Sequence, residues 1–330
     1  MYTSYDNSSL VKIITLLKSH KSEYLSGQDI SESLKLSRAA VWKHIKKLQS
    51  LGYKIDSRPK IGYRLTGTTE LPLPWEIRDG LETKLFGKRV YYFDTINSTQ
   101  NFAIELASRP QENGTVVIAQ KQTQGRGRLN RKWTSPSGGI WMSLILHPEF
   151  EISVSTFFPI ISSLALAVSI EKVLKINPQI KWPNDLTINN KKVAGILIDA
   201  SIESGNIGYL ILGVGINFKI NVKEIENNIK NTGNFYGVAT LVNKKIKDSP
   251  VKLVQRFLLE IERLYTLFLD GNSEYIAKQW TSRSSTIGKT IMIKSQHGPI
   301  KGKAIKIDKD GALVISSKGR NQRVLVGDVS

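Results

Sequence analysis

A segment rich in glycine and arginine, residues 122–133, most constrains the fold because it lies between two apolar runs. The runs at 115–119 and 139–146 are short and almost entirely apolar, which predicts two buried strands. The glycines of the segment let its backbone approach a ligand and expose N–H groups, and its arginines add forked donors that suit carboxylates and phosphates. The segment is therefore a candidate anion site, although its composition also fits a plain solvated turn.

The order of residues in this segment, Gly125, Arg126, Gly127 and Arg128, differs from the familiar nucleotide motifs. The dinucleotide pattern Gly-x-Gly-x-x-Gly would need glycine in place of Asn130, and Gly-x-x-x-x-Gly-Lys-Ser/Thr occurs nowhere in the chain. Neither a Rossmann nor a P-loop nucleotide site is indicated.

Composition narrows the class of protein. The length of 330 residues predicts two or three domains, and a hydrophobic share of 40% is ordinary for globular cores. The absence of cysteine excludes disulfides, zinc–thiolate sites and a cysteine nucleophile, and it suits a reducing cytoplasm. The first nine residues show no signal-peptide pattern, and the longest apolar stretch, 157–170, is too short and broken to span a bilayer. We therefore expect a cytoplasmic protein without membrane association.

The N-terminal part carries a disproportionate share of the net charge of +19, because residues 1–65 hold 12 Lys and Arg against 5 Asp and Glu. Apolar residues at helical spacing predict one helix near 10–17, a short second helix at 28–34 and a third at 37–49. A basic hairpin at 53–65 follows, so the segment resembles a winged helix-turn-helix whose third helix reads DNA. The predicted DNA contacts are Gln28, Ser37, Arg38, Trp42, Lys43, Lys46 and Lys47.

The rest of the chain predicts an α+β protein. Residues 66–74 form a proline-punctuated linker, and 75–283 show no regular strand–helix alternation, which favours a mixed central domain with a largely antiparallel sheet. The polar segment 221–242 is expected to be a mobile loop over the ligand site. Short strands separated by hairpin turns in 284–330 predict a small C-terminal β-barrel of SH3-like type.

Four central motifs, at 125–133, 181–186, 192–197 and 213–218, closely resemble those of biotin protein ligases. Residues 37–45 resemble the DNA-binding domain of the bifunctional members, which are also biotin operon repressors. The resemblance covers nearly the whole chain in the family's order, and four motifs together are far more specific than any one alone.

The resemblance implies a reaction in two steps. Biotin and ATP, with Mg²⁺, give biotinyl-5′-AMP and pyrophosphate, and the biotinyl group then passes to a lysine of a biotin carboxyl carrier protein, a subunit of acetyl-CoA carboxylase. It also implies that ligand binding promotes a homodimer that binds operator DNA and represses biotin biosynthesis genes. Because the first step brings together two anions, the site needs fixed positive charge.

The resemblance also assigns roles to residues of the central domain. Arg126, Arg128 and Lys192 are the candidate catalytic cations. One residue departs from the family pattern, because Gln100 stands where asparagine is common. The residues matched to biotin and adenylate binding are Ser98, Thr99, Gln100, Gln122, Arg126, Gly127, Arg128, Lys192, Gly195 and Asn217.

Several roles remain open at this point. Asp185 is a candidate to bind Mg²⁺ or to orient Lys192, and Phe235 or Tyr236 is a candidate contact for the adenine ring. Structural roles compete with the functional ones, because Ser98 could simply cap its helix and Lys192 could be an ordinary hairpin residue.

Three other functions compete with the bifunctional ligase. One is a ligand-sensing transcription factor without ligase activity, and another is a biotin ligase whose winged helix no longer regulates. The third is a lipoate ligase, whose Arg-Arg-x-x-Gly-Gly-Gly-x-Val-x-His-Asp pattern is missing here.

Overall fold

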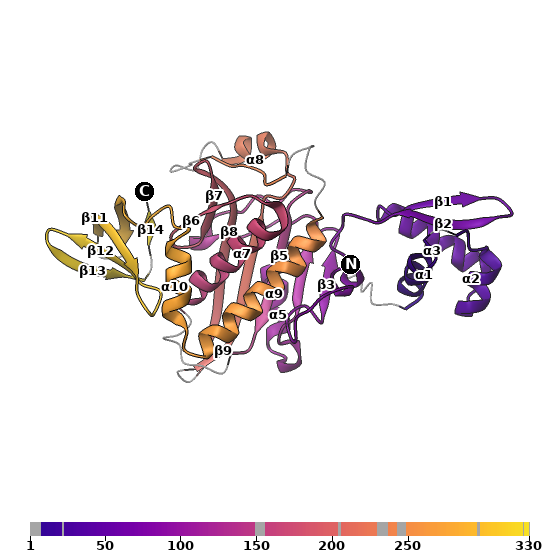
Figure 1. The fold of residues 1–330 in the computed structure, drawn as a ribbon, viewed down its shortest axis with the longest axis horizontal. Helices are drawn as coiled ribbons and strands as arrows, with labels where there is room; N and C mark the ends of the chain where they lie inside the picture. The colour runs from indigo at the N-terminus through magenta and orange to yellow at the C-terminus, as the bar shows by residue number, and fades with distance from the viewer. Residues whose placement is uncertain are drawn as a thin grey trace.

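The computed structural model describes residues 8–21, 23–148, 156–203, 206–229, 237–242, 249–295, 298–325 and 327–329. The chain forms three parts in sequence order: a helical part with a hairpin, a central sheet with helices, and a C-terminal sheet (Figure 1). The central part lies between the other two, and the predicted α+β class is confirmed. None of the helices in the described ranges is long and apolar enough to cross a membrane.

The N-terminal part has the predicted helix-turn-helix and wing. Lys35 ends the second helix in the left-handed region with φ of 52°. The Ser37 hydroxyl then accepts a hydrogen bond from the backbone N–H of Ala40 at 3.1 Å and caps the third helix. The elements are α1 (Ser8–Ser19), α2 (Gly27–Leu34), α3 (Arg38–Ser50) and the antiparallel hairpin β1 (Lys54–Arg58) and β2 (Gly62–Gly67).

The central part is built on a seven-stranded sheet in the order β3-β4-β5-β9-β8-β7-β6. Only the pair β3–β4 is parallel, so the prediction of a largely antiparallel sheet is confirmed. The strands are β3 (Val90–Phe93), β4 (Val116–Ala119), β5 (Ile140–Leu146), β6 (Gln179–Lys181), β7 (Asp185–Ile188), β8 (Lys191–Glu203) and β9 (Asn206–Ile216). The helices are α4 (Pro74–Arg78), α5 (Thr99–Ala107), α7 (Phe158–Leu174), α8 (Val222–Ile229), α9 (Pro250–Leu269) and α10 (Ser273–Thr281).

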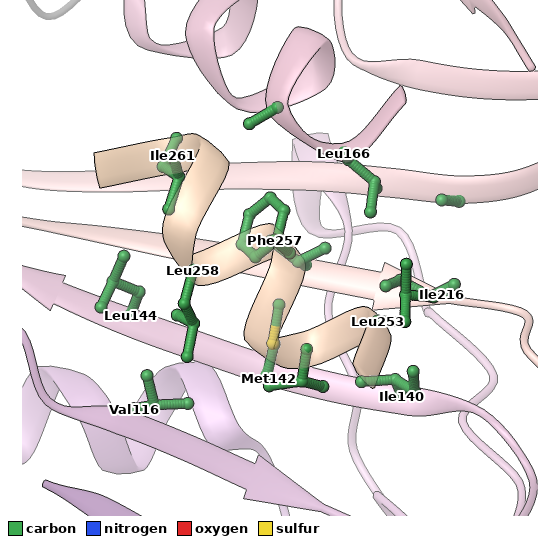
Figure 2. Packing of buried hydrophobic residues seen from close by; sticks show 14 of the residues in the cluster. Val116, Ile140, Met142, Leu144, Leu166, Ile216, Leu253, Phe257, Leu258 and Ile261 are labelled. Atoms are coloured by element: carbon green, nitrogen blue, oxygen red, sulfur yellow. The ribbon is translucent and has the colours of Figure 1, made fainter. Parts of the chain in front are cut away.

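Helices cover the two faces of this sheet unequally. Figure 2 shows Phe257 and Leu258 of α9 against Val116 and Leu144, in the large core that α7 and α9 close. Alternate strand residues such as Val117 point the other way and pack with α5 in a smaller core. The short α5 covers only part of its face, and its N-terminal end starts beside the Gly-Arg segment.

The C-terminal part is a five-stranded antiparallel sheet in the order β13-β12-β11-β10-β14. No pairing between β13 and β14 closes it into a barrel within the described residues. Its strands are β10 (Thr290–Ser295), β11 (Gly298–Ile307), β12 (Leu313–Ser317), β13 (Arg320–Val324) and β14 (Asp328–Val329).

The expectation of a mobile loop at 221–242 is wrong for much of that segment. Helix α8 occupies its first part, and Ile225 is buried in a small apolar cluster that includes Trp141. At its other end, the backbone of Lys192 hydrogen bonds with both Gly237 and Ala239. Tertiary contacts therefore order the described parts of this polar segment, 221–229 and 237–242, and residues 230–236 lie outside the described residues.

A partly buried polar junction joins the winged helix to the central part. The Lys18 ammonium lies 2.8 Å from Glu76 and 2.9 Å from Asp79 in and just after α4. Tyr53 donates to Glu76 as well, and Gln255 of α9 donates to three backbone carbonyls at α4. Burial alone would lower the pKa of Lys18, but its hydrogen bonds with Glu76 and Asp79 raise it above the ordinary value. Helix α4 thus holds the DNA-binding part on one side and α9 on the other.

Glu260 is a second buried carboxylate, with a side chain 1% exposed and with three cations around it, Lys172, Arg256 and Arg263. Burial raises the pKa of Glu260, but hydrogen bonds from Lys172 and Arg263 outweigh burial and hold the pKa below its ordinary value. Such a depressed carboxylate stabilises the fold at neutral pH and loses this contribution as the pH falls through its folded pKa.

Replacing Glu260 with glutamine should lower the free energy of unfolding at pH 7 by about 1–3 kcal/mol, because a charged acceptor is lost among three cations. The deficit should shrink below about pH 4.5, where this carboxylate begins to protonate in the unfolded chain, and it should vanish as the pH falls through the lower folded pKa. Urea melts over pH 3–8 measure both quantities, with the exposed Glu274→Gln as the matched control. A deficit that is independent of pH would contradict the assignment.

Candidate functional site

The first part of the candidate site lies at the start of α5. Ser98 caps this helix by accepting from the N–H of Asn101 at 3.3 Å, so the structural role considered for it is present. The side-chain carbonyl of Gln122 accepts from the Thr99 N–H at 2.8 Å, and its amide donates to the Ser135 hydroxyl at 2.9 Å. Ser98, Thr99, Gln122 and Ser135 therefore lie close together at the start of α5, although they come from three separate segments of the chain.

Gln100 lies deeper, with 4% of its surface exposed. Its carbonyl oxygen accepts from the Ser143 hydroxyl at 2.9 Å, and its amide donates to Asp199 and to the Ile211 carbonyl, each at 3.2 Å. The longer side chain at this position therefore reaches across to β8 and β9. A Cβ atom at Gly213 would come within 2.5 Å of the Gln100 carbonyl oxygen, so any larger residue there would displace the Gln100 side chain.

The Gly-Arg segment folds back on itself. The N–H of Trp133 donates to the Gly125 carbonyl at 2.8 Å, and the N–H of Gly127 donates to the Arg131 carbonyl at 2.7 Å. A Cβ atom at Gly125 would lie 2.4 Å from the Trp133 carbonyl, which explains this glycine. Leu129 at the tip has a left-handed φ of 54°, and its side chain is exposed.

The two arginines of the segment have different partners. Arg126 donates to Asp199 at 2.7 Å, and its Nε atom is buried without a hydrogen-bond partner among the described residues. Arg128 donates to Asn184 at 3.1 Å and to the Gly327 carbonyl of the C-terminal part at 3.2 Å. The segment is therefore fixed to the sheet by one arginine and to the C-terminal part by the other.

Lys192 begins a separate cluster. Its ammonium lies 2.6 Å from the Asp185 carboxylate and 4.9 Å from the centre of the Trp133 ring. The amide of Asn217 donates to the Lys192 backbone carbonyl at 3.2 Å. Strand pairing therefore holds Lys192 in place, and it is not a loose hairpin residue.

Two glycines form the floor beneath the Trp133 ring. Gly195 and Gly215 are direct partners in the β8–β9 pairing, and a Cβ atom at Gly215 would lie 2.6 Å from the indole nitrogen of Trp133. We call Gly195 and Gly215 the glycine floor. The indole nitrogen is buried and has no hydrogen-bond partner among the described residues. The Trp133 ring therefore lies directly on this backbone, and two unpaired donors, its nitrogen and Arg126 Nε, could each serve a ligand with oxygen acceptors.

Chemically, the site offers polar groups at the start of α5 and cations in the Gly-Arg segment and at Lys192. Both Arg126 and Lys192 are held by carboxylates, Asp199 and Asp185. Such an arrangement can orient an anionic ligand and neutralise charge that develops between two anions. No group of three or more metal-ligating side chains occurs among the described residues.

Sequence reasoning missed Asp199, Ser135 and Ser143. Asp199 and Ser143 are polar residues inside strands that are otherwise largely apolar, and that was the available signal. Phe235 and Tyr236 lie outside the described residues, so their predicted contact with adenine stays a prediction.

The predicted DNA-binding residues lie apart from this site, on the N-terminal part. Arg38, Trp42, Lys43, Lys46 and Lys47 are exposed on α3. Trp42 is 56% exposed, with the Lys46 ammonium 5.9 Å from its ring centre, so it is not a core residue. Ser37 serves as the cap of α3, and Gln28 is exposed on α2, where it hydrogen bonds with Glu32.

The β1–β2 hairpin, which is the wing, carries two arginines whose side chains are held in place. The guanidinium groups of Arg58 and Arg64 lie 5.0 and 4.5 Å from the ring centre of Tyr24, whose hydroxyl donates to Asp56. The stacking, together with ion pairs from both arginines to Asp56, fixes these two side chains of the wing close to the start of α2.

Two family models match the chain: the biotin/lipoate A/B protein ligase family over residues 92–217 and a helix-turn-helix domain over residues 10–64. The bifunctional ligase/repressor BirA of Bacillus spizizenii is 36% identical over 318 residues, which cover 96% of this chain and 97% of that protein. The BirA protein of Bacillus subtilis is 34% identical over the same shares.

A solved structure supports the same relationship. The biotin protein ligase from Aquifex aeolicus, in complex with biotin and ATP, superposes with a TM-score of 0.60 at 28% identity. The match covers 74% of this chain and 98% of that chain. With both halves matched in order over almost the full length, this chain belongs to the bifunctional ligase/repressor family of biotin protein ligases.

Proposed function

We propose that the chain joins biotin to ATP over the glycine floor and then transfers biotin to a lysine of the carrier subunit of acetyl-CoA carboxylase. The observation that carries this assignment is Lys192, held 2.6 Å from Asp185 and beside the Trp133 ring at the edge of the glycine floor. A fixed cation beside an aromatic face suits a carboxylate that must meet an adenine nucleotide.

In the first step a carboxylate oxygen of biotin attacks the α-phosphorus of ATP. The bond from that phosphorus to the bridging oxygen breaks, and pyrophosphate leaves with the bonding electrons. Lys192 and the arginines of the Gly-Arg segment offset the repulsion between the two anions and the charge that develops on the phosphorus oxygens. Thr99, Gln100 and Gln122 offer the donors and acceptors that the ureido group of biotin needs.

Asp185 has an orienting role in this proposal, because its carboxylate is already paired with Lys192. Mg²⁺ enters with ATP, whose phosphates supply most of its ligands, as is usual for this hard cation. Asp185→Asn should therefore raise the KM for biotin and lower the rate of adenylate formation, and the Mg²⁺ dependence of the rate should keep its midpoint. A large shift of that midpoint would instead make Asp185 a metal ligand.

In the second step the unprotonated amine of a carrier lysine attacks the carbonyl carbon of the mixed anhydride. The carbon–oxygen bond to AMP breaks, an amide forms, and the amine proton passes to water. The folded Gly-Arg segment shields the anhydride from hydrolysis before the carrier arrives.

The N-terminal part serves as the operator-binding domain, in a homodimer that spans two half-sites. The proposed boundaries are a winged helix over residues 1–65, a linker at 66–74, the ligase domain at 75–283 and the C-terminal domain at 284–330. The cytoplasm, where both carboxylase and DNA are present, is the proposed location.

Incubation with labelled biotin, ATP and a purified carrier domain tests the ligase directly. Label should enter the carrier only when ATP is present, and a carrier whose acceptor lysine is replaced should stay unlabelled. Absence of transfer to the intact carrier would leave the alternative of a ligand-sensing transcription factor without ligase activity.

A further inference from the structure

We infer that Asp199 is a positioning residue for this reaction: it holds Arg126 and links that arginine to the residues at the start of α5. The inference rests on the proposed function, because it assigns those residues to one ligand. Asp199 lies on β8 opposite Ile211 of β9, four residues along the strand from the glycine floor at Gly195. It is on the same face of the sheet, since side chains alternate along a strand.

A continuous chain of hydrogen bonds starts and ends in the Gly-Arg segment. It starts at the Trp133 carbonyl, which accepts from Ser135, and it ends at Arg126, which donates to Asp199. Each consecutive pair in it lies within 3.2 Å. Its members between the two ends are Ser135, Gln122, Thr99, Ser143, Gln100 and Asp199.

The middle of this chain is buried. Thr99 is 3% exposed, Gln100 is 4% exposed and Ser143 is 0% exposed. A buried polar group that loses its partner is costly, so these side chains keep their orientations together. A displacement of the Gln100 side chain therefore changes the position of Asp199, because the Gln100 amide donates a hydrogen bond to the Asp199 carboxylate.

Asp199 has two donors on a single oxygen. Its Oδ2 atom accepts from Arg126 Nη2 at 2.7 Å and from Gln100 Nε2 at 3.2 Å. This pairing orients the guanidinium and leaves the buried Arg126 Nε as a donor for a ligand oxygen. Without the carboxylate, the Arg126 side chain would become ordered only when the ligand binds. The loss of side-chain entropy would then oppose binding, and the affinity for the ligand would fall.

A different role for Asp199, competition with the ligand for Arg126, predicts the opposite change in affinity. If Asp199 only competed with the ligand for Arg126, removing its charge would strengthen binding of an anionic ligand. The positioning role predicts weaker binding, so the sign of the change separates the two roles.

The test uses the full-length protein with Asp199→Asn, which keeps the shape and removes the charge. The dissociation constant for biotin and the dissociation rate of preformed biotinyl-5′-AMP should each rise about five- to tenfold, the effect of losing one charge-assisted hydrogen bond. The KM for biotin should rise with them, while kcat at saturating biotin should change less than twofold or so. Asp199→Glu should restore part of the loss, which a general packing defect would not show.

Two further variants keep the result interpretable. Asp270→Asn, an exposed carboxylate at the end of α9, is the matched control and should bind biotin like the wild type. Ser143→Ala breaks the chain without touching Arg126 and should shift binding in the same direction. Its effect should not add fully to that of Asp199→Asn, because both act through Gln100.

Unchanged or tighter binding by Asp199→Asn, with a thermal melt like that of the wild type, would overturn the inference. Full additivity of the two substitutions would overturn the link between them. Failure of the wild type to form biotinyl-5′-AMP would be a different result, because it would remove the proposed function itself.

Discussion

Replacing Lys192 with alanine should lower the rate of biotin-dependent pyrophosphate release about 100- to 1,000-fold, the usual effect of losing one preorganised donor at a developing charge. The Lys192 side chain is 24% exposed and its ammonium lies 2.6 Å from Asp185, so its charge acts in a partly desolvated setting. The substitution also removes the cation beside Asp185, so the negative charge of Asp185 is less neutralised where two anions must meet. We therefore expect kcat to fall more than the affinity for ATP.

The neighbouring lysine provides a close control. Lys191 is also in β8, but its side chain is exposed and it has no contact with Asp185 or Trp133 among the described residues. Lys191→Ala should retain pyrophosphate release within about twofold, as expected of a surface substitution. Equal losses in the two variants would assign the effect to the strand and not to the Lys192 ammonium.

Reversing the charges of Arg38 and Lys43 on α3 should weaken operator binding at least about 100-fold and reduce the salt slope of binding by about two, because two phosphate contacts are lost. Both side chains are exposed on the helix that is expected to enter the major groove. Biotin transfer to the carrier should be unaffected, since α3 contributes no side chain to the ligase site. Filter binding over a series of salt concentrations measures the slope.

A control with the same net charge is available on the ligase domain. Lys252 on α9 and Lys278 on α10 are exposed, and Lys252→Glu/Lys278→Glu changes the total charge by the same amount. Operator binding by this variant should stay within a few-fold of the wild type, because long-range charge is screened beyond about 10 Å at 0.1 M salt. A similar loss in both variants would mean that net charge, and not the α3 surface, governs binding.

Local patterns in the sequence were sufficient to predict those parts of the fold that consist of a single helix or turn. The third helix of the winged domain follows from Val41, Ile45 and Leu48 at helical spacing, and all three are buried. The position of Lys192 next to a strand likewise follows from an apolar run. Both features are decided by residues that lie close together in the sequence, so the sequence alone was enough to predict them.

The pairing of Arg126 with Asp199 could not be predicted in this way. The two residues are 73 positions apart, and their contact depends on the register of β8 against β9. A one-residue change in that register would turn Asp199 to the other face. The helix in the asparagine-rich segment has a similar origin, because Ile225 is buried in a small apolar cluster with Trp141, which lies far from it in the sequence.

If one chain makes biotinyl-5′-AMP and uses its presence to control DNA binding, a gel shift on the protein's own biotin-gene promoter should report both activities at once. We predict a shift at low protein concentration only when biotin and ATP are both present, and no such gain for Lys192→Ala. A shift that is equally strong without biotin and ATP would contradict the claim.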